Sequence, residues 1–194
     1  LQQNSMHAVV TDVFESSARL IEYTRRHKPS VWFGDAGVIY RITKEMEHAT
    51  DLSRLGVRVL FLTMGYGADA MRTNLETIWG CRVLTHYGLT ETGWGLAVEC
   101  PAMHGYHYNE FGVITEVIDP ETGEPLPEGM EGELVFTTIG REAMPLLRYR
   151  SRDIAWLRSA PCACGCTLDA IGPVAKRQEA VALLPNGTEV YPTM

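Results

Sequence analysis

The sequence lacks long hydrophobic runs and blocks of basic residues. No apolar stretch approaches the ~18 residues that a membrane-spanning helix needs, so we expect no membrane contact. The formal net charge is −7, and the absence of a basic block argues against a nucleic-acid-binding surface. These absences are typical of an ordinary globular protein.

Cysteine is scarce as well, and its pattern is not that of a disulfide scaffold. The five cysteines are an odd number, and they indicate a reducing compartment, which predicts a cytoplasmic location. No signal peptide is expected. The first residue is Leu1 rather than Met, so we expect the chain to be a piece of a longer protein.

Up to about residue 100, apolar runs alternate with segments of helical periodicity. A helix is expected over about residues 11–28, with an inner face of Val10, Phe14, Ala18 and Ile21. Strands are expected at 31–33, 57–62 and 81–85, with helices between them. This alternation predicts right-handed βαβ units, a parallel sheet with flanking helices and an α/β subdomain over residues 1–100.

After Glu99 the pattern changes to consecutive strands separated by turns rich in glycine and proline. Strands are expected at about 107–117, 132–138, 145–148 and 154–157, and a hairpin at 184–192. The fold class is therefore α/β, followed by a small antiparallel sheet or partial barrel that forms a β-rich subdomain over residues 101–175.

A chemically dense loop, residues 86–93, follows the strand at 81–85. Gly88 allows close backbone approach, Tyr87 offers a flat ring, and Thr90 and Glu91 supply oxygen ligands suited to phosphate and Mg²⁺. In parallel sheets, ligands bind beyond the carboxyl ends of strands. The alternative is an ordinary polar turn.

A second loop, Gly65-Tyr66-Gly67, follows the strand at 57–62 and is predicted to lie on the same edge of the sheet. Any strand-to-helix turn favours glycine, so this loop is informative only together with the first.

Three arginines and an aspartate are concentrated in residues 148–153. In a strand the arginines would share one face, and Asp153 would lie on the other. An aspartate at a strand end can accept two sugar hydroxyls, while arginines bind phosphate or carboxylate. The alternative is a surface network of arginine and aspartate.

Four soft ligands from two loops match a closed structural Zn²⁺ site. Cys162 and Cys164 come from one loop, and Cys100 and His107 come from the other, with His104 between them. Cys166 could exchange into the set, and free thiols in a turn are the alternative. Cys81 is expected in the core.

These motifs together resemble the phenylacetate–CoA ligase branch of the adenylate-forming superfamily. The resemblance rests on residues 87–91, on Glu99-Cys100 followed by Gly105-Tyr106-His107, and on residues 132–138 and 142–153. It covers most of the chain in the expected order, and it implies part of the large N-terminal domain of such an enzyme. It also implies that residues 176–194 are a hinge-like segment and the start of a further domain.

The resemblance implies a role for each candidate residue. Glu91 would hold Mg²⁺ near the phosphates, and Thr90 would contact the AMP phosphate. Tyr87 and Gly88 would line the adenine and acyl pocket, Asp153 would bind the ribose hydroxyls, and residues 65–67 would form the adenine-side loop. Cys162 and Cys164, together with Cys100 and His107, match a zinc set that this branch often carries.

The implied activity is ATP-dependent, AMP-forming ligation of a carboxylic acid, most naturally an aryl acid, to coenzyme A. Thr63-Met64-Gly65 replaces the usual Gly-Gly-Glu, and Lys176–Ala180 departs from the usual hinge sequence. A lysine-bearing phosphate loop and a C-terminal catalytic domain would lie outside the chain, so we expect it to be inactive alone. The alternatives are an adenylyl transferase of the coenzyme F390 synthetase type and a zinc-stabilised binding or regulatory module. A homodimer is possible.

Overall fold

The computed structural model describes residues 7–12, 14–63, 69–93, 95–102, 105–159, 161–174, 176–177, 182–183 and 189–190. They divide into two compact units, one up to Leu84 and one from Thr85 onward, each with its own core. The helices in these residues are too short or too polar to cross a membrane.

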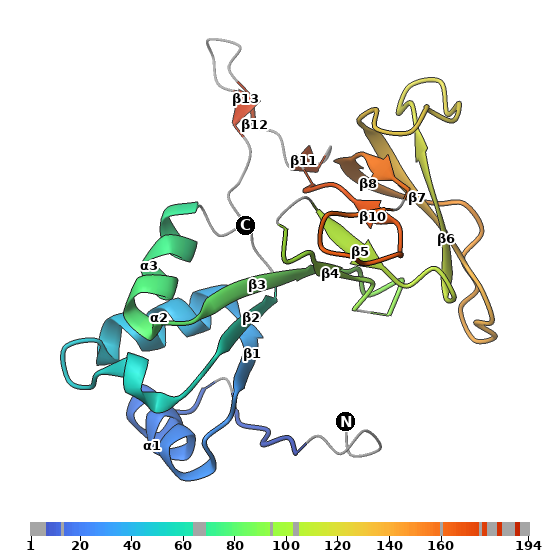
Figure 1. The fold of residues 1–194 in the computed structure, drawn as a ribbon. Helices are drawn as coiled ribbons and strands as arrows, with labels where there is room; N and C mark the ends of the chain where they lie inside the picture. The colour runs from blue at the N-terminus through green and yellow to red at the C-terminus, as the bar shows by residue number, and fades with distance from the viewer. Residues whose placement is uncertain are drawn as a thin grey trace. The chain divides into compact units, whose positions relative to one another are not determined.

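The first unit has the predicted alternation of strand and helix (Figure 1). In chain order it contains α1 (Ser17–His27), β1 (Val31–Asp35), α2 (Ala36–Met46), the 3-10 helix η2 (Leu52–Leu55), β2 (Val59–Thr63), α3 (Asp69–Trp79) and the start of β3 (Arg82–Tyr87). Strands β1 and β2 are parallel, with Val31 opposite Val59. The α/β prediction for this part of the chain is therefore confirmed.

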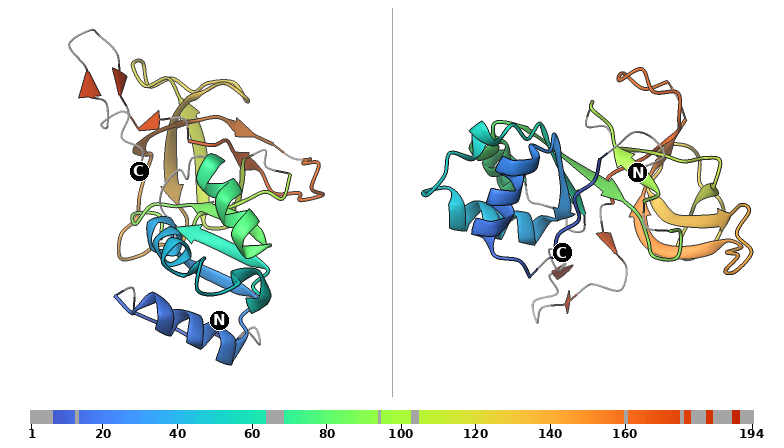
Figure 2. Two further views of the ribbon diagram at one scale, coloured as in Figure 1. Left: turned by 90° about the vertical axis from the view of Figure 1, so that its left-hand side faces the viewer. Right: turned by 90° about the horizontal axis from the view of Figure 1, so that it is seen from below.

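The helices of the first unit lie beside its strands (Figure 2). Each helix packs through one apolar stripe. Ile21 of α1, Ile42 of α2 and Leu75 of α3 are fully buried or nearly so, around Leu60 of β2. Two details of the expected first helix are wrong. It begins at Ser17, and Val10 and Phe14 are each 92% exposed, because hydrophobic spacing alone does not show which residues find a packing surface.

The second unit is built of strands joined by turns. Its strands are β4 (Ala97–Glu99), β5 (Tyr106–Tyr108), β6 (Val113–Ile118), β7 (Gly132–Thr138), β8 (Tyr149–Ala155), β9 (Leu157–Arg158), β10 (Ala170–Ile171) and β11 (Lys176–Arg177). One sheet has the order β11-β8-β7-β6, and the end of β3 continues through β4, β5, β10 and β9. All pairs among these strands are antiparallel.

The predicted change to antiparallel β structure is thus confirmed for the described residues between 107 and 157, which hold strands and turns but no helix. The expected strand at 145–148 is wrong. Strand β8 begins only at Tyr149, and Leu147 is 84% exposed before it. Strand β12 (Ala182–Leu183) pairs antiparallel with β13 (Glu189–Val190). The expected hairpin at 184–192 lies mostly outside the described residues.

Candidate active site and cysteine cluster

The loop that follows β3 is folded by its own side chains. Leu89 is buried in the core of the second unit, and the Thr92 hydroxyl both accepts from Leu89 N (3.3 Å) and donates to Leu89 O (3.1 Å). The backbone N–H of Thr92 also donates to Leu89 O (3.1 Å). This closed turn leaves Thr90 exposed and Glu91 half-buried.

Arg141 holds the same loop from outside. Its Nη1 donates to Glu91 O at 2.9 Å, and its Nη2 donates to Thr92 O. Gly93 has φ 94°, and a Cβ at this position would overlap the Arg141 guanidinium. Arg141 was not predicted as a site residue, because an arginine that binds backbone carbonyls 50 residues away leaves no local sequence signal.

Two hydrogen bonds join the loop region to β8, although the residues are far apart in sequence. The Tyr87 hydroxyl, at the end of β3, donates to Asp153 Oδ2 at 2.8 Å. The Tyr149 hydroxyl donates to Glu91 Oε1 at 3.2 Å. We call Tyr87, Glu91, Tyr149 and Asp153 the tyrosine–carboxylate cluster. Asp153 is 4% exposed, so its carboxylate depends on such donors for solvation.

The structure therefore places five of the predicted site residues in one region of the second unit. Gly88 and Thr90 lie in the loop between Tyr87 and Glu91, and Asp153 faces Tyr87. Gly65, Tyr66 and Gly67 lie outside the described residues. Tyr149 was not given a role by the sequence, although it stands at the start of the arginine-rich stretch.

The four predicted zinc ligands also come together. One ligand atom from each of Cys100, His107, Cys162 and Cys164 lies within 4.8 Å of all the others. Cys100 Sγ is 3.4 Å from Cys162 Sγ, and Cys164 Sγ is 3.3 Å from His107 Nε2. Zinc–ligand bonds of about 2.0–2.3 Å place tetrahedral ligand atoms roughly 3.3–3.8 Å apart, so this spacing fits the metal.

Neighbouring groups affect the protonation of the candidate zinc ligands. His107 Nδ1 lies 2.8 Å from Leu168 O, so this nitrogen carries the proton and Nε2 keeps its lone pair. The backbone N–H of Cys164 lowers the pKa of the Cys162 thiol to about 6. Although the N–H of Cys166 donates to Cys164, burial and the adjacent Cys100 and Cys162 sulfur atoms raise the pKa of Cys164 to about 11. A bound cation would favour the thiolate forms of Cys162 and Cys164 together.

Solved structures show the class of fold. A 2-hydroxyisobutyryl-CoA ligase, solved in the postadenylation state with R3-HIB-AMP, matches with a TM-score of 0.80 at 22% identity, over 91% of this chain and 38% of that one. A long-chain-fatty-acid-CoA ligase from Archaeoglobus fulgidus matches with a TM-score of 0.57 at 15% identity, over 86% of this chain and 40% of that one. The fold is that of part of the N-terminal domain of adenylate-forming enzymes.

Sequence comparison then shows the family: residues 4–141, well over half of the chain, match the family of AMP-binding enzymes, and the chain belongs to it. A phenylacetate-coenzyme A ligase of Thermus thermophilus is 42% identical over 127 residues, which is 64% of this chain and 28% of the relative. One from Escherichia coli (strain K12) is 34% identical over 147 residues, 74% of this chain and 33% of the relative. The chain spans about a third of the length of these curated relatives.

Proposed function

We propose that the protein containing this chain activates a carboxylic acid with ATP and transfers it to coenzyme A. In the first step a carboxylate oxygen attacks the α-phosphorus of ATP, which forms an acyl-adenylate and releases pyrophosphate. In the second step the CoA thiol displaces AMP and forms the thioester. The observation that carries the proposal is the tyrosine–carboxylate cluster, which places an aromatic ring and two carboxylates beside one loop in a family of AMP-binding enzymes.

The surroundings of the cluster residues and of the adjacent loop support a role for several of them. The Asp153 carboxylate would accept the ribose hydroxyls, and the Tyr87 hydroxyl bond would hold it in position. The ring of Tyr87 and the backbone at Gly88 would border the adenine and the acyl group. Thr90 is exposed at the tip of the turn, where its hydroxyl would contact the AMP phosphate.

Glu91 fits a magnesium site, because its half-buried carboxylate is held by one neutral donor, Tyr149, at 3.2 Å. Mg²⁺ is typically bound by one or two carboxylates together with substrate phosphates and water. When bound, the ion would neutralise charge that develops on the phosphates. The loop at residues 65–67 would complete the adenine side, as the resemblance implies.

For the acid, we propose an aryl acid of the phenylacetate type. The support is that the two relatives described above are phenylacetate-coenzyme A ligases and share 34–42% identity with this chain. The adenylyl transferase and the regulatory module are not favoured by these relatives.

We also propose that Cys100, His107, Cys162 and Cys164 bind a structural Zn²⁺. The donor set of three sulfurs and one nitrogen is characteristic of closed structural sites, which have no open coordination position. The site would link the turn after β4 to the loop between β9 and β10. Its contribution would be to folding and not to the reaction.

The test of the ligase is pyrophosphate release by the full-length protein, measured with ATP and Mg²⁺ across a panel of carboxylic acids with and without CoA. We expect acid-dependent release with phenylacetate or a related aryl acid, and formation of the thioester and AMP when CoA is added. Asp153→Ala is the matched negative control. Release that does not depend on any acid would contradict the proposal, and release without thioester formation would favour the adenylyl transferase.

A further inference from the structure

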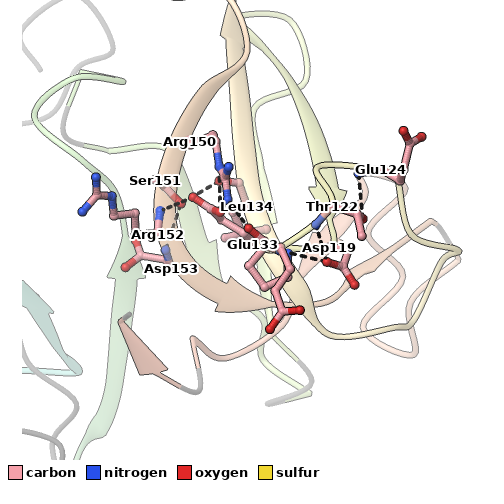
Figure 3. A network of polar contacts seen from close by, with 11 residues as sticks. Asp119, Thr122, Glu124, Glu133, Leu134, Arg150, Ser151, Arg152 and Asp153 are labelled. Atoms are coloured by element: carbon pink, nitrogen blue, oxygen red, sulfur yellow. Dashed lines mark hydrogen bonds and ion pairs between the residues drawn. The ribbon is translucent and has the colours of Figure 1, made fainter. Parts of the chain in front are cut away.

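A carboxylate outside the tyrosine–carboxylate cluster is completely buried in β7, the strand next to β8. Glu133 in β7 is 0% exposed, and its two oxygens have separate partners (Figure 3). Oε2 accepts from Nε of Arg150 at 2.9 Å and from Nη2 of the same guanidinium. Oε1 accepts from the backbone N–H of Arg152 at 3.0 Å. An ion pair with Arg150 would account only for the position of Oε2.

The bond to Arg152 falls where β8 is irregular. Glu133 is opposite Ile154 and Val135 is opposite Arg150, so one residue of β7 faces three residues of β8. The extra residues are accommodated by Arg152, whose backbone has φ 63°. This left-handed conformation is unfavourable for a residue with a side chain, so it requires support from its surroundings. Oε1 of Glu133 provides that support at the residue's own N–H.

The irregularity determines where the next side chain points. Side chains alternate between the faces of a regular strand, so the backbone at Arg152 decides which way Asp153 faces. In the structure Asp153 is directed to the hydroxyl of Tyr87 at 2.8 Å. Ser151 helps to hold the same bulge, since its hydroxyl donates to Leu134 O (2.8 Å) and accepts from Asp153 N (3.1 Å).

The Glu133 carboxylate is held by Arg150, and Arg150 is bonded to the turn between β6 and β7. Asp119 accepts from the backbone N–H groups of Glu121 (2.8 Å) and Thr122 (2.9 Å), and this turn presents the carbonyl of Pro120. Arg150 Nη2 donates to Pro120 O at 2.7 Å. Arg150 thus neutralises Glu133 while tied to the turn, which keeps the charge of Glu133 inside the sheet and leaves Oε1 for the backbone of β8.

We infer that Glu133 is a positioning residue, which holds Arg152 in the left-handed conformation and thereby aims Asp153 at its ligand. The identity of that ligand, a nucleotide ribose, rests on the proposed function. The positioning itself does not, and it can be tested without any nucleotide.

The variant Glu133→Gln keeps the size of the side chain but leaves one acceptor oxygen. We expect that oxygen to remain with the charged Arg150, so that the amide NH₂ meets the N–H of Arg152, donor against donor. A crystal structure of the full-length variant should show Arg152 out of the left-handed region and the bond between Tyr87 and Asp153 lost. If both features persist in the folded variant, the inference is wrong, whatever the protein binds.

Nucleotide binding provides the second readout. Wild-type protein should bind AMP about tenfold or more tightly than 2′,3′-dideoxyadenosine monophosphate, because only AMP has ribose hydroxyls for Asp153. Glu133→Gln should lose this preference while its affinity for the dideoxy compound stays the same. The double variant Glu133→Gln with Arg152→Gly should regain most of the preference, because glycine adopts positive φ without support.

The matched control is Glu116→Gln, which removes a partly exposed ion pair with Arg148 (3.2 Å) on the same sheet and should leave the AMP preference unchanged. Wild type that binds both compounds equally would contradict the ribose role of Asp153, and the crystal structure would then still decide the positioning. A folded double variant that does not prefer AMP over the dideoxy compound would refute the positioning role of Glu133. If Glu133→Gln unfolds and Arg152→Gly does not rescue it, Glu133 serves folding only, and the inference also fails.

Discussion

Loss of one zinc ligand should separate metal binding from ordinary thiol packing. In Cys164→Ser the sulfur that lies 3.3 Å from His107 Nε2 is replaced by a hydroxyl, which is a poor ligand for Zn²⁺. Cys166→Ser is the matched control. It changes a thiol two residues away, outside the four clustered donors, and it retains the Cys166 N–H that donates to Cys164.

The size of the effect follows from the metal's share of stability. Structural zinc sites with four ligands contribute roughly 10–16 kcal/mol of apparent binding free energy, so one ligand accounts for about 3 kcal/mol. For a protein of 150–250 residues, 1 kcal/mol corresponds to about 2–4 °C in the melting temperature. Cys164→Ser should therefore melt about 6–12 °C lower than wild type.

The assay combines metal analysis with thermal unfolding, on protein purified without chelator. We expect about one zinc per chain in wild type and in Cys166→Ser, and much less in Cys164→Ser. Little zinc in wild type, together with a wild-type melting temperature for Cys164→Ser, would refute the site. Equal zinc loss in the two variants would show that the ligand set is wrong.

Three further predictions concern the nucleotide site of the full-length protein. Asp153→Ala should weaken AMP binding about 10- to 100-fold, as measured by calorimetry, because it removes charge-assisted hydrogen bonding worth roughly 1.5–3 kcal/mol in total; unchanged affinity would exclude the ribose role. Glu91→Gln should lower the rate of pyrophosphate release while leaving AMP affinity within about threefold, and an equal loss in both would contradict a role in binding magnesium. Arg141→Met should slow pyrophosphate release about tenfold with a nearly unchanged melting temperature, since it frees the carbonyls of Glu91 and Thr92; a normal rate would show that the loop holds its shape alone.

Strand β7 illustrates what local pattern can predict. Residues 132–138 were expected as a strand and are one, because the apolar run is bounded by a turn and its valine, phenylalanine and threonine residues favour extended backbone. The neighbouring expectation at 145–148 was wrong for a tertiary reason. Arg148 has φ 48°, and its N–H donates to the Thr137 hydroxyl (3.0 Å), a partner on another strand that no local window contains.

The candidate site shows the same division. The chemistry of Tyr87, Thr90, Glu91 and Asp153 could be predicted, because each side chain carries its functional groups wherever it lies. The roles of Glu133 and Arg141 could not be predicted, because each side chain bonds to a backbone group distant in sequence. Glu133 accepts from the N–H of Arg152. Arg141 donates to the carbonyls of Glu91 and Thr92.

The sequence by itself therefore determined most of the helices and strands, the four candidate metal ligands and the side chains available for nucleotide chemistry, because periodicity and residue type are local properties. Only the tertiary structure decided that Tyr87 faces Asp153, that Tyr149 reaches Glu91 and that a buried carboxylate supports a left-handed residue in β8. These contacts depend on strand register and on one bulge, and a change of a single residue in register would turn the same side chains to the other face of the sheet.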